Sequence, residues 1–272
     1  MNGKELSLAL RQAGPVFGTL ITSPSPRLPA SLNGSGLDFV FLDTEHIALD
    51  RSELSWMCQV YQQLGMAPLV RIPEPNPNLA TMVLDGGAAG VIAPYVETAQ
   101  QVKELVGATK CRPLKGQRLK RHLNGEPLEP ALKQYVDQHN AQNVLVINVE
   151  SQPALDSLDE MLQVPGLDAV LVGPHDLSCS LGIPEQYDHP EFEQAVQTII
   201  KQARARHVGA GIHFWGNMQQ EIHWLRAGLN MLIHSADISL FTKQLRRELE
   251  DIQSALNPAM PQTRFRQQDV II

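Results

Sequence analysis

The sequence predicts a single (β/α)₈ barrel, also called a TIM barrel, within the α/β class. Eight short runs rich in Val, Ile and Leu alternate along the chain with longer segments of helical pattern. The runs are continuously apolar, as expected for parallel strands that are buried on both faces. The chain has 272 residues, and barrels of this kind contain about 250.

The eight predicted strands are separated by turn and helix signals. They cover residues 15–21, 37–43, 67–72, 90–95, 143–150, 167–173, 207–213 and 229–234. Eight strand–helix units favour a closed barrel over an open doubly wound sheet. No GxGxxG turn follows the first strand, which argues against a dinucleotide-binding fold.

Helices are predicted between the strands from their capping residues and apolar spacing. A Pro/Ser-rich loop with a short helix follows the first strand. The later helices are predicted at residues 50–65, 76–87, 97–109, 151–163, 190–206, 217–227 and 237–256. The first of these illustrates the signals, because it begins at the capping residue Asp50 and ends at Gly65.

One basic segment interrupts this pattern between the fourth and fifth units. Residues 111–130 combine Gly and Pro with the basic run from Lys115 to Arg121. We expect a long loop at the top of the barrel, because long loops in compact domains are usually functional. The barrel domain is expected to span residues 1–256, and residues 257–272 form a tail beyond the eighth unit.

Composition narrows the possible functions. The formal net charge of −7 disfavours nucleic acid as a partner, because phosphate binding needs a basic face. The N-terminus has no apolar run of the signal-peptide type, and no stretch of about 18 apolar residues suggests a membrane span. The three cysteines form no CxxC pair, so we expect reduced thiols in a cytoplasmic protein.

Polar residues gather where the predicted strands end, which is where barrel active sites lie. These strand-end residues are Asp43, Glu45, His46, Arg71, Asn148, Glu150, His175, Asp176, His213 and His234. Because parallel strands in a barrel end at the same rim, we expect these side chains to converge there.

Several of these residues allow two interpretations. Glu150 and Asp176 are hard oxygen ligands that suit Mg²⁺ or Mn²⁺, but each could instead cap the helix that follows it. Arg71 could hold a substrate carboxylate or form an ion pair with Asp43 or Glu45. His46 could be a general acid or base near neutral pH or a hydrogen-bonded structural residue.

Other residues carry weaker signals. Asp85 lies near the end of a predicted helix, where an acidic residue is typical of solvated surface. His207, His213, His223 and His234 form no zinc-binding motif, and we expect core or loop roles for them. No lysine lies at a predicted strand end, which argues against a Schiff-base aldolase.

Taken in order, the strand-end motifs resemble those of the HpcH/HpaI-type class II aldolases. These are barrels of the phosphoenolpyruvate/pyruvate type, and they include 2-dehydro-3-deoxyglucarate and 4-hydroxy-2-oxo-heptane-1,7-dioate aldolases. The resemblance runs from Phe17 to about Asp237, through FVFLDTEH, PLVRIPEPNP, VLDGGAAGVIAPYVETAQQ, VINVES and LDAVLVGPHDLSCSLG. It implies a divalent-metal-dependent carbon–carbon lyase. The reaction would join or split a pyruvate-type 2-oxo acid enolate and an aldehyde.

The resemblance also implies residue roles. Glu150 and Asp176 would bind one divalent cation, which is Mg²⁺ or Mn²⁺, with Co²⁺ also suited. Arg71 would hold the 2-oxo acid and stabilise its enolate, and His46 would be the general base. Asp85 would raise the basicity of His46, from its own or an adjacent subunit. Asn148, His175 and Asp176 would contact the substrate.

The resemblance further implies a homo-oligomer, a hexamer or a related assembly built by exchange of C-terminal helices. Three positions depart from the family pattern. Asn148 stands where the family has Gln, His175 where it has a small residue, and Leu119 where it has the second glycine of a G-x-R-G loop. These changes leave the aldehyde partner open.

Two further functions stay open from the sequence. The chain could be a related metal-dependent barrel lyase for a CoA ester or a phosphoenolpyruvate-type substrate, with Lys115 to Arg121 holding the phosphate. It could also be an inactive barrel that serves as a binding module, an interpretation that His175 and Leu119 motivate.

Overall fold

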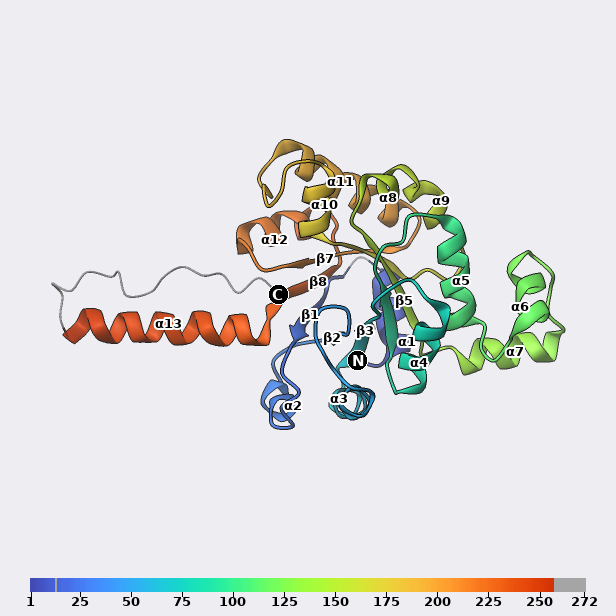
Figure 1. Ribbon diagram of the computed structural model, residues 1–272, viewed down its shortest axis with the longest axis horizontal. Coiled ribbons are helices and arrows are strands. Elements are labelled where there is room, and N and C mark those ends of the chain that lie inside the picture. Colours follow the sequence, from blue (N-terminus) through green and yellow to red (C-terminus); the bar gives the residue numbers. More distant parts are fainter. Residues whose placement is uncertain (13, 257–272) are drawn as a thin grey trace.

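The computed structural model describes residues 1–12 and 14–256, and its centre is a closed barrel of eight parallel strands in sequence order (Figure 1). The strands are β1 (Val16–Ile21), β2 (Phe39–Asp43), β3 (Ala67–Arg71), β4 (Gly90–Ala93), β5 (Val144–Val149), β6 (Ala169–Val172), β7 (Gly209–Phe214) and β8 (Met231–Ala236). Pairing of β1 with β8 closes the ring. The predicted fold class and all eight predicted strands are confirmed.

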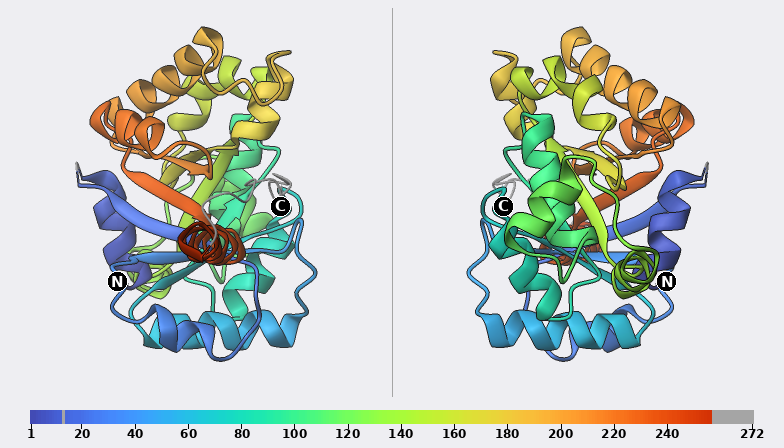
Figure 2. Two further views of the ribbon diagram at one scale, coloured as in Figure 1. Left: turned by 90° about the vertical axis from the view of Figure 1, so that its left-hand side faces the viewer. Right: turned by 90° about the vertical axis from the view of Figure 1, so that its right-hand side faces the viewer.

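Helices surround the barrel (Figure 2). They are α1 (Gly3–Arg11), α2 (Leu28–Leu32), α3 (Arg51–Gln63), α4 (Pro77–Asp85), α5 (Ala99–Lys110), α6 (Gly116–Leu123), α7 (Pro130–His139), α8 (Gln152–Asp156), α9 (Leu158–Leu162), α10 (Pro174–Ser180), α11 (Pro190–Ala205), α12 (Met218–Arg226) and α13 (Asp237–Leu256). Several of these helices begin at a residue whose side chain caps the first backbone N–H groups. At α3, the Asp50 side chain accepts the N–H groups of Ser52 and Glu53, and the Glu53 side chain binds back to Asp50.

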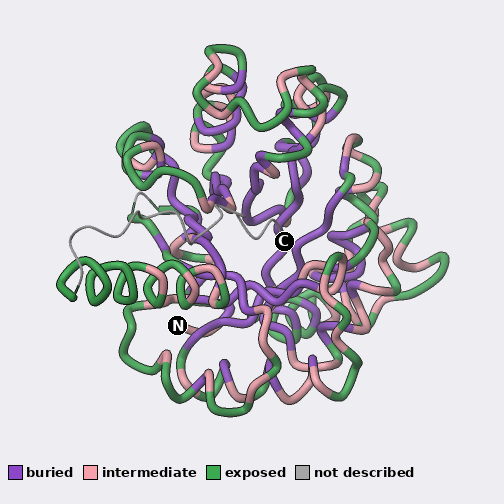
Figure 3. Tube along the Cα trace, turned by 60° about the vertical axis from the view of Figure 1, so that its left-hand side comes forward, coloured by how far each residue is buried: buried purple, intermediate pink, exposed green. Residues whose placement is uncertain are grey.

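The strands carry apolar side chains on both faces, which explains their continuously apolar sequences. In β5, Val144 and Val146 belong to the core inside the barrel, whereas Leu145 and Ile147 belong to the core between barrel and helices. Figure 3 shows the strands as the buried centre of the molecule, with exposed residues on the outer helices.

Helix α1, which the sequence analysis did not predict, closes the N-terminal end of the barrel. Leu6 and Leu10 are fully buried and extend the core inside the barrel. The buried carboxylate of Asp168, just before β6, anchors the helix, because it accepts hydrogen bonds from Ser7 Oγ at 2.6 Å and Arg11 Nη2 at 3.0 Å. The C-terminal ends of the strands therefore form the end of the barrel that α1 does not cover.

The prediction of a barrel-top loop at residues 111–130 is wrong. This segment connects the end of α5 to the start of β5 through α6 and α7, so it lies at the N-terminal ends of the strands. Asn140 Nδ2 donates to the Arg112 carbonyl at 2.7 Å, and Asn143 Nδ2 donates to the Thr109 carbonyl at 2.8 Å. Only connections from a strand to the next helix reach the barrel top, and this one runs from helix to strand.

Helix α13 extends away from the barrel (Figure 1) and has no buried residue. Its start at Asp237 and its end at Leu256 agree with the predicted last helix. The expected tail at 257–272 lies outside the described residues. Within residues 1–12 and 14–256, no helix combines the length and the apolar character that a membrane crossing requires.

Candidate active site

The strand ends enclose a cavity of about 290 Å³ at the C-terminal rim of the barrel. Six of the seven residues that were predicted to form the site line it, namely His46, Arg71, Asn148, Glu150, His175 and Asp176. A larger cavity of about 860 Å³ lies between α4, α5 and α6. That cavity contains none of these six side chains, so we place the chemistry in the smaller one.

Arg71 and Asp43 form a bidentate ion pair in the cavity. Arg71 Nε donates to Asp43 Oδ1 at 2.8 Å and Nη2 donates to Oδ2 at 2.7 Å, in a bidentate arrangement. Asp43 is fully buried and also accepts the N–H groups of Glu45 and His46. Burial alone would raise the pKa of Asp43, but the hydrogen bonds and positive charge of Arg71 hold it below its usual value.

Both interpretations of Arg71 are compatible with its position. Its Nε lies 3.1 Å from Glu45 Oε2, and its guanidinium stacks over the Phe41 ring at 5.3 Å from the ring centre. Burial would lower the pKa of Arg71, but Asp43 and Glu45 raise it above the ordinary value. The side chain is therefore a fixed positive charge that forms ion pairs and also lines the cavity.

Glu150 does not cap the helix that follows it. Ser151 takes that role, since its side chain accepts the N–H of Ala154 at the start of α8. Glu150 Oε1 instead accepts the Tyr95 N–H at 2.7 Å, and Oε2 accepts Asn148 Nδ2 at 2.8 Å. The pKa of Glu150 is raised mainly by burial and further by the negative charges of Asp176 and Glu45, against the lowering effect of these two hydrogen bonds.

Asp176 also makes no helix cap. The residue before α10 is Gly173, no side chain caps this helix, and the Asp176 carboxylate lines the cavity. The neighbouring His175 has Nδ1 at 3.6 Å from Asp176 Oδ1 and Nε2 at 4.0 Å from Glu185 Oε1. His175 is therefore a half-exposed ring at the cavity wall between two carboxylates.

The donor set at this rim fits a hard divalent cation. Glu150 and Asp176 offer carboxylate oxygens, and Asn148 Oδ1 is buried without a hydrogen-bond partner in the described part of the chain. Oxygen ligands of this kind suit Mg²⁺ or Mn²⁺. Over residues 1–12 and 14–256, no three His, Cys, Asp or Glu side chains are grouped to hold a metal. The residues at this rim that could hold a cation are the two carboxylates Glu150 and Asp176.

His46 and Asp85 are not brought together within one chain. His46 is exposed in the loop after β2, with Nε2 at 3.7 Å from Glu45 Oε1. Asp85 ends α4 next to the glycines that lead into β4, at the opposite end of the barrel. It is exposed there and forms an ion pair with Arg112.

The sequence analysis missed Tyr95, which follows β4. Its backbone φ of 55° lies in the left-handed region that favours glycine, and this conformation presents its N–H to Glu150. A side-chain hydrogen bond to Glu45, together with burial and the nearby acidic charges, raises the pKa of Tyr95 to about 12. Its position just after a strand was the available signal, but the contribution of a backbone N–H does not depend on the residue type and leaves no mark in the sequence.

Two residues of β7 and the loop after it complete the cavity wall. We expected a core or loop role for His213, and its ring instead lines the cavity beside Trp215. His234, at the end of β8, pairs with the buried Glu221, and His223 pairs with Glu193. His223 is exposed on α12 (Met218–Arg226), so it has neither the core role nor the loop role that was expected for it.

The chain is similar to known proteins along most of its length. The family model described as HpcH/HpaI aldolase/citrate lyase matches residues 17–243. A 2-keto-3-deoxy-L-rhamnonate aldolase of Klebsiella pneumoniae subsp. pneumoniae is 31% identical over 246 residues, which are 90% of this chain and 91% of that protein. The protein of the same name from Escherichia coli strain K12 is 31% identical over 249 residues, covering 91% and 92%.

Among solved structures, an HpcH/HpaI aldolase from Desulfitobacterium hafniense DCB-2 superimposes with a TM-score of 0.78. It is 26% identical to this chain, and the match covers 95% of this chain and 96% of that one. The similarity therefore includes the barrel together with the strand ends that form the cavity.

Proposed function

This chain belongs to the HpcH/HpaI aldolase/citrate lyase family and is a carbon–carbon lyase, and from that premise we propose that its cavity joins or splits a pyruvate-type 2-oxo acid and an aldehyde. The observation that carries the proposal is the shared cavity in which the fixed charge of Arg71 lies with the carboxylates of Glu150 and Asp176. The name of the relatives, 2-keto-3-deoxy-L-rhamnonate aldolase, supports a 4-hydroxy-2-oxo acid as the substrate class.

Glu150 and Asp176 would hold one divalent cation, with Mg²⁺ or Mn²⁺ preferred and Co²⁺ also suited. When bound, such a cation supplies positive charge that polarises the 2-oxo group. The Tyr95 N–H and the Asn148 amide orient the Glu150 carboxylate, since each binds one of its oxygens. Asn148, His175 and Asp176 line the cavity where the substrate would lie.

Arg71 would bind the 2-oxo acid and stabilise the negative charge that develops on it. Asp43 occupies its Nε and one hydrogen of Nη2, and Nη1 has no hydrogen-bond partner among the described residues. The bidentate pair fixes the guanidinium before the substrate arrives, so stabilisation of the charge needs no reorganisation of the side chain. Arg71 thus acts as a preorganised donor.

His46 would be the general base for the aldol hydroxyl. In cleavage it would take the proton of the C4 hydroxyl, and the C3–C4 bond would break. C4 would leave as an aldehyde, and the electron pair of the broken bond would form the enolate of the pyruvate half. The enolate then takes a proton at C3 to give the 2-oxo acid. The exposed position of His46 lets its ring reach substrate and exchange protons with solvent.

Asp85 can support His46 only from another subunit, because the two residues lie at opposite ends of one barrel. A homo-oligomer would also cover the exposed apolar side chains of α13, which include Ile238, Phe241 and Leu245. A hexamer, or a related assembly formed by exchange of these helices, accommodates both features. The unpaired thiols of Cys58 and Cys111, both buried, support a cytoplasmic location.

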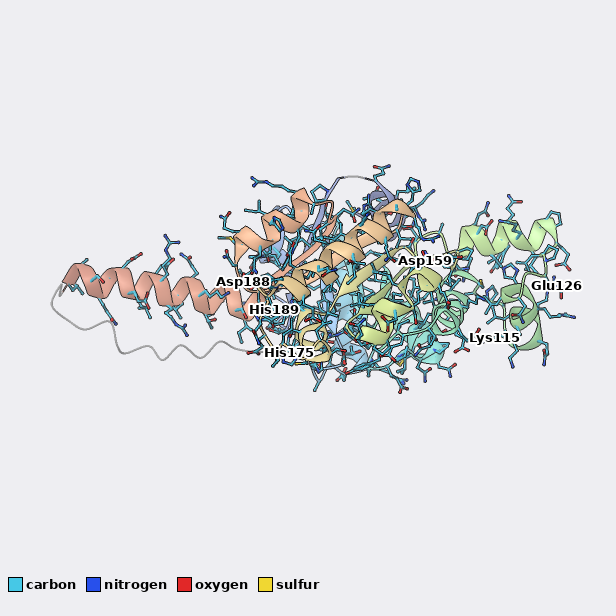
Figure 4. The ribbon with its side chains drawn as sticks, turned by 90° about the horizontal axis from the view of Figure 1, so that it is seen from above. Lys115, Glu126, Asp159, His175, Asp188 and His189 are labelled. Atoms are coloured by element: carbon cyan, nitrogen blue, oxygen red, sulfur yellow. The ribbon has the colours of Figure 1, made fainter. Side chains whose placement is uncertain are left out.

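The alternatives receive less support from the structure. The basic run from Lys115 to Arg121, which motivated a CoA ester or phosphoenolpyruvate-type substrate, lies at the far end of the barrel from the cavity. Figure 4 shows Lys115 far from His175. No lysine lines the cavity in the described part of the chain, which disfavours a Schiff base. The complete set of Arg71, Glu150 and Asp176 disfavours an inactive barrel.

The test is release of pyruvate from 4-hydroxy-2-oxo acids, measured with lactate dehydrogenase and NADH. The wild-type protein should release pyruvate only with added Mg²⁺ or Mn²⁺. Glu150→Ala should lose at least about 100-fold in rate, in line with the loss of an electrostatic group at a reacting centre. Glu160→Ala is the matched control, because Glu160 is exposed on α9. Equal rates for both variants would refute the proposed site.

A further inference from the structure

The cavity has two chemically different sides. Its charged side is formed by Arg71 on β3 and by Glu150 and Asp176, which follow β5 and β6. In a closed ring of eight strands, β7 lies opposite β3. His213 and Trp215 belong to that opposite side, and none of the cavity's apolar or aromatic side chains carries a fixed charge. Leu20 on β1 and Phe41 on β2 extend this uncharged wall back to Arg71, whose guanidinium lies over the Phe41 ring.

His213 is held in one orientation on this wall. Its Nε2 lies 3.2 Å from the carbonyl oxygen of Ser235, and a carbonyl can only accept, so Nε2 carries the proton. The ring packs edge-on against Phe41 at 5.4 Å and against Trp215 at 5.2 Å between ring centres. Ser235, the penultimate residue of β8, has a φ of 54°, which is an uncommon conformation for a residue other than glycine.

The ring presents one unused acceptor to the cavity. Burial, together with the positive charge of Arg71, lowers the pKa of His213 to about 4 despite the hydrogen bond to Ser235. A neutral ring that is protonated at Nε2 has a lone pair at Nδ1. Within residues 1–12 and 14–256, no donor is hydrogen-bonded to this nitrogen, although the ring lines the cavity.

We propose that His213 is a specificity-determining residue that selects aldehydes with a neutral hydroxyl group next to the carbonyl carbon. The inference rests on the proposed aldolase function and concerns the half of the substrate that does not become pyruvate. Nδ1 accepts the hydrogen of that hydroxyl, while the carbon chain packs on Leu20, Phe41 and Trp215.

The chemistry of the wall excludes other groups at this position. A carboxylate offers no hydrogen to Nδ1, so its oxygens would face the lone pair of another acceptor. A methyl group in place of the hydroxyl leaves Nδ1 without a donor, which is unfavourable for a desolvated acceptor. The pyruvate half would lie against Arg71, Glu150 and Asp176, so His213 should not affect enolisation.

The test compares glycolaldehyde with propanal, two aldehydes of equal heavy-atom count that differ by OH against CH₃. For each enzyme, kcat/KM is measured for aldol addition of pyruvate to both aldehydes. The ratio of the two values, taken relative to wild type, cancels the intrinsic reactivity of the aldehydes. His213→Leu should lower the glycolaldehyde preference about tenfold, the size expected for one hydrogen bond. His213→Gln, whose amide oxygen can accept, should keep most of it.

Exchange of pyruvate methyl protons with deuterium serves as the internal control, since it involves only the pyruvate half. Unchanged exchange with an unchanged aldehyde ratio in His213→Leu would overturn the role of His213 and leave the aldolase function intact. Absence of both exchange and addition in the wild-type protein would refute the aldolase function and with it this inference.

A measurement on the wild-type protein covers the case in which the variants do not fold. In a ¹⁵N histidine spectrum, His213 should remain neutral and protonated at Nε2 between about pH 6 and 8. The charged groups that act on it are Arg71, Asp43 and His234. Protonation of both ring nitrogens, or of Nδ1 alone, within this range would overturn the proposal, because no acceptor would then be available.

Discussion

At the scale of single residues, Asp43 organises the strand-two end of the cavity. Its carboxylate binds Arg71 through two hydrogen bonds and also accepts the N–H groups of Glu45 and His46. One fully buried anion therefore fixes the guanidinium and the loop that carries His46. Because Asp43 and Arg71 are in direct contact, we expect the effects of substituting them on the free energy of unfolding to be non-additive.

Arg71→Leu should reduce the free energy of unfolding by about 3–5 kcal/mol, because it leaves the buried Asp43 charge without a partner. The double variant Asp43→Asn/Arg71→Leu should recover a large part of this loss, since the uncompensated charge is gone. Urea denaturation of both variants measures the difference. Equal stability of the single and double variants would contradict this account of the pair.

The same pair predicts a pH dependence. The pKa of Asp43 in the folded protein lies below its ordinary value of 3.8, so the unfolded chain binds this proton more readily. The stabilisation is therefore fully present above the unfolded pKa and is lost as the pH falls through the folded pKa. The stability difference between wild type and Asp43→Asn should be constant near neutral pH and shrink below about pH 4. A difference that grows on acidification would contradict the assignment.

Residue types at strand ends were enough to predict most of the polar side chains that line the cavity, since a barrel brings the C-terminal ends of all its strands to one rim. The sequence pattern alone could not decide which side chains contact each other. Arg71 had two candidate carboxylates and contacts both. Asp85 was assigned from resemblance, and its distance from His46 within one chain depends on α4 running from one end of the barrel to the other. Tyr95 was missed because its contribution is mainly a backbone N–H.

At the scale of secondary-structure elements, the strands were predicted correctly and one helix-to-strand connection was not. The strands were predictable because both of their faces are buried, which requires continuously apolar sequences. The prediction for segment 111–130 named the wrong end of the barrel because it rested on the expectation that a long loop in a compact domain is functional. Its position follows instead from chain order, because it links the end of α5 to the start of β5.

Helix α1 provides a test at this scale. Leu6→Ala should reduce the free energy of unfolding by about 2–5 kcal/mol, because Leu6 is fully buried where the helix closes the barrel. Leu8→Ala is the matched control on the same helix, since Leu8 is exposed. Thermal or urea unfolding measures both. A loss below about 1 kcal/mol for Leu6→Ala would show that α1 is not part of the cooperative barrel core.

At the scale of the whole molecule, α13 is the feature that a single chain does not explain. The helix has no buried residue and leaves Phe241, Ile252 and Leu256 among its exposed apolar side chains. Water-exposed apolar stripes of this kind usually mark a contact surface. His46 and Asp85 lie at opposite ends of one barrel. Asp85 could therefore act on His46 only if it came from a neighbouring subunit.

Phe241→Asp combined with Leu245→Asp should therefore lower the oligomeric state, as measured by light scattering coupled to size-exclusion chromatography. Burying two charges in an apolar contact is strongly unfavourable. Glu250→Ala on the same helix should leave the mass unchanged. A wild-type protein that is monomeric at micromolar concentration would contradict the assembly, and so would an unchanged mass of the double variant.

The central claim is that the rim cavity forms the enolate of pyruvate, and deuterium exchange at the pyruvate methyl group tests it without knowledge of the aldehyde. Pyruvate in D₂O is followed by ¹H NMR with metal-depleted protein, before and after addition of Mg²⁺, Mn²⁺ or Co²⁺. We predict exchange that requires both added metal and Glu150, so that Glu150→Ala is silent while Glu160→Ala is active. Failure of the wild-type protein to exchange with any of the three metals would contradict the claim.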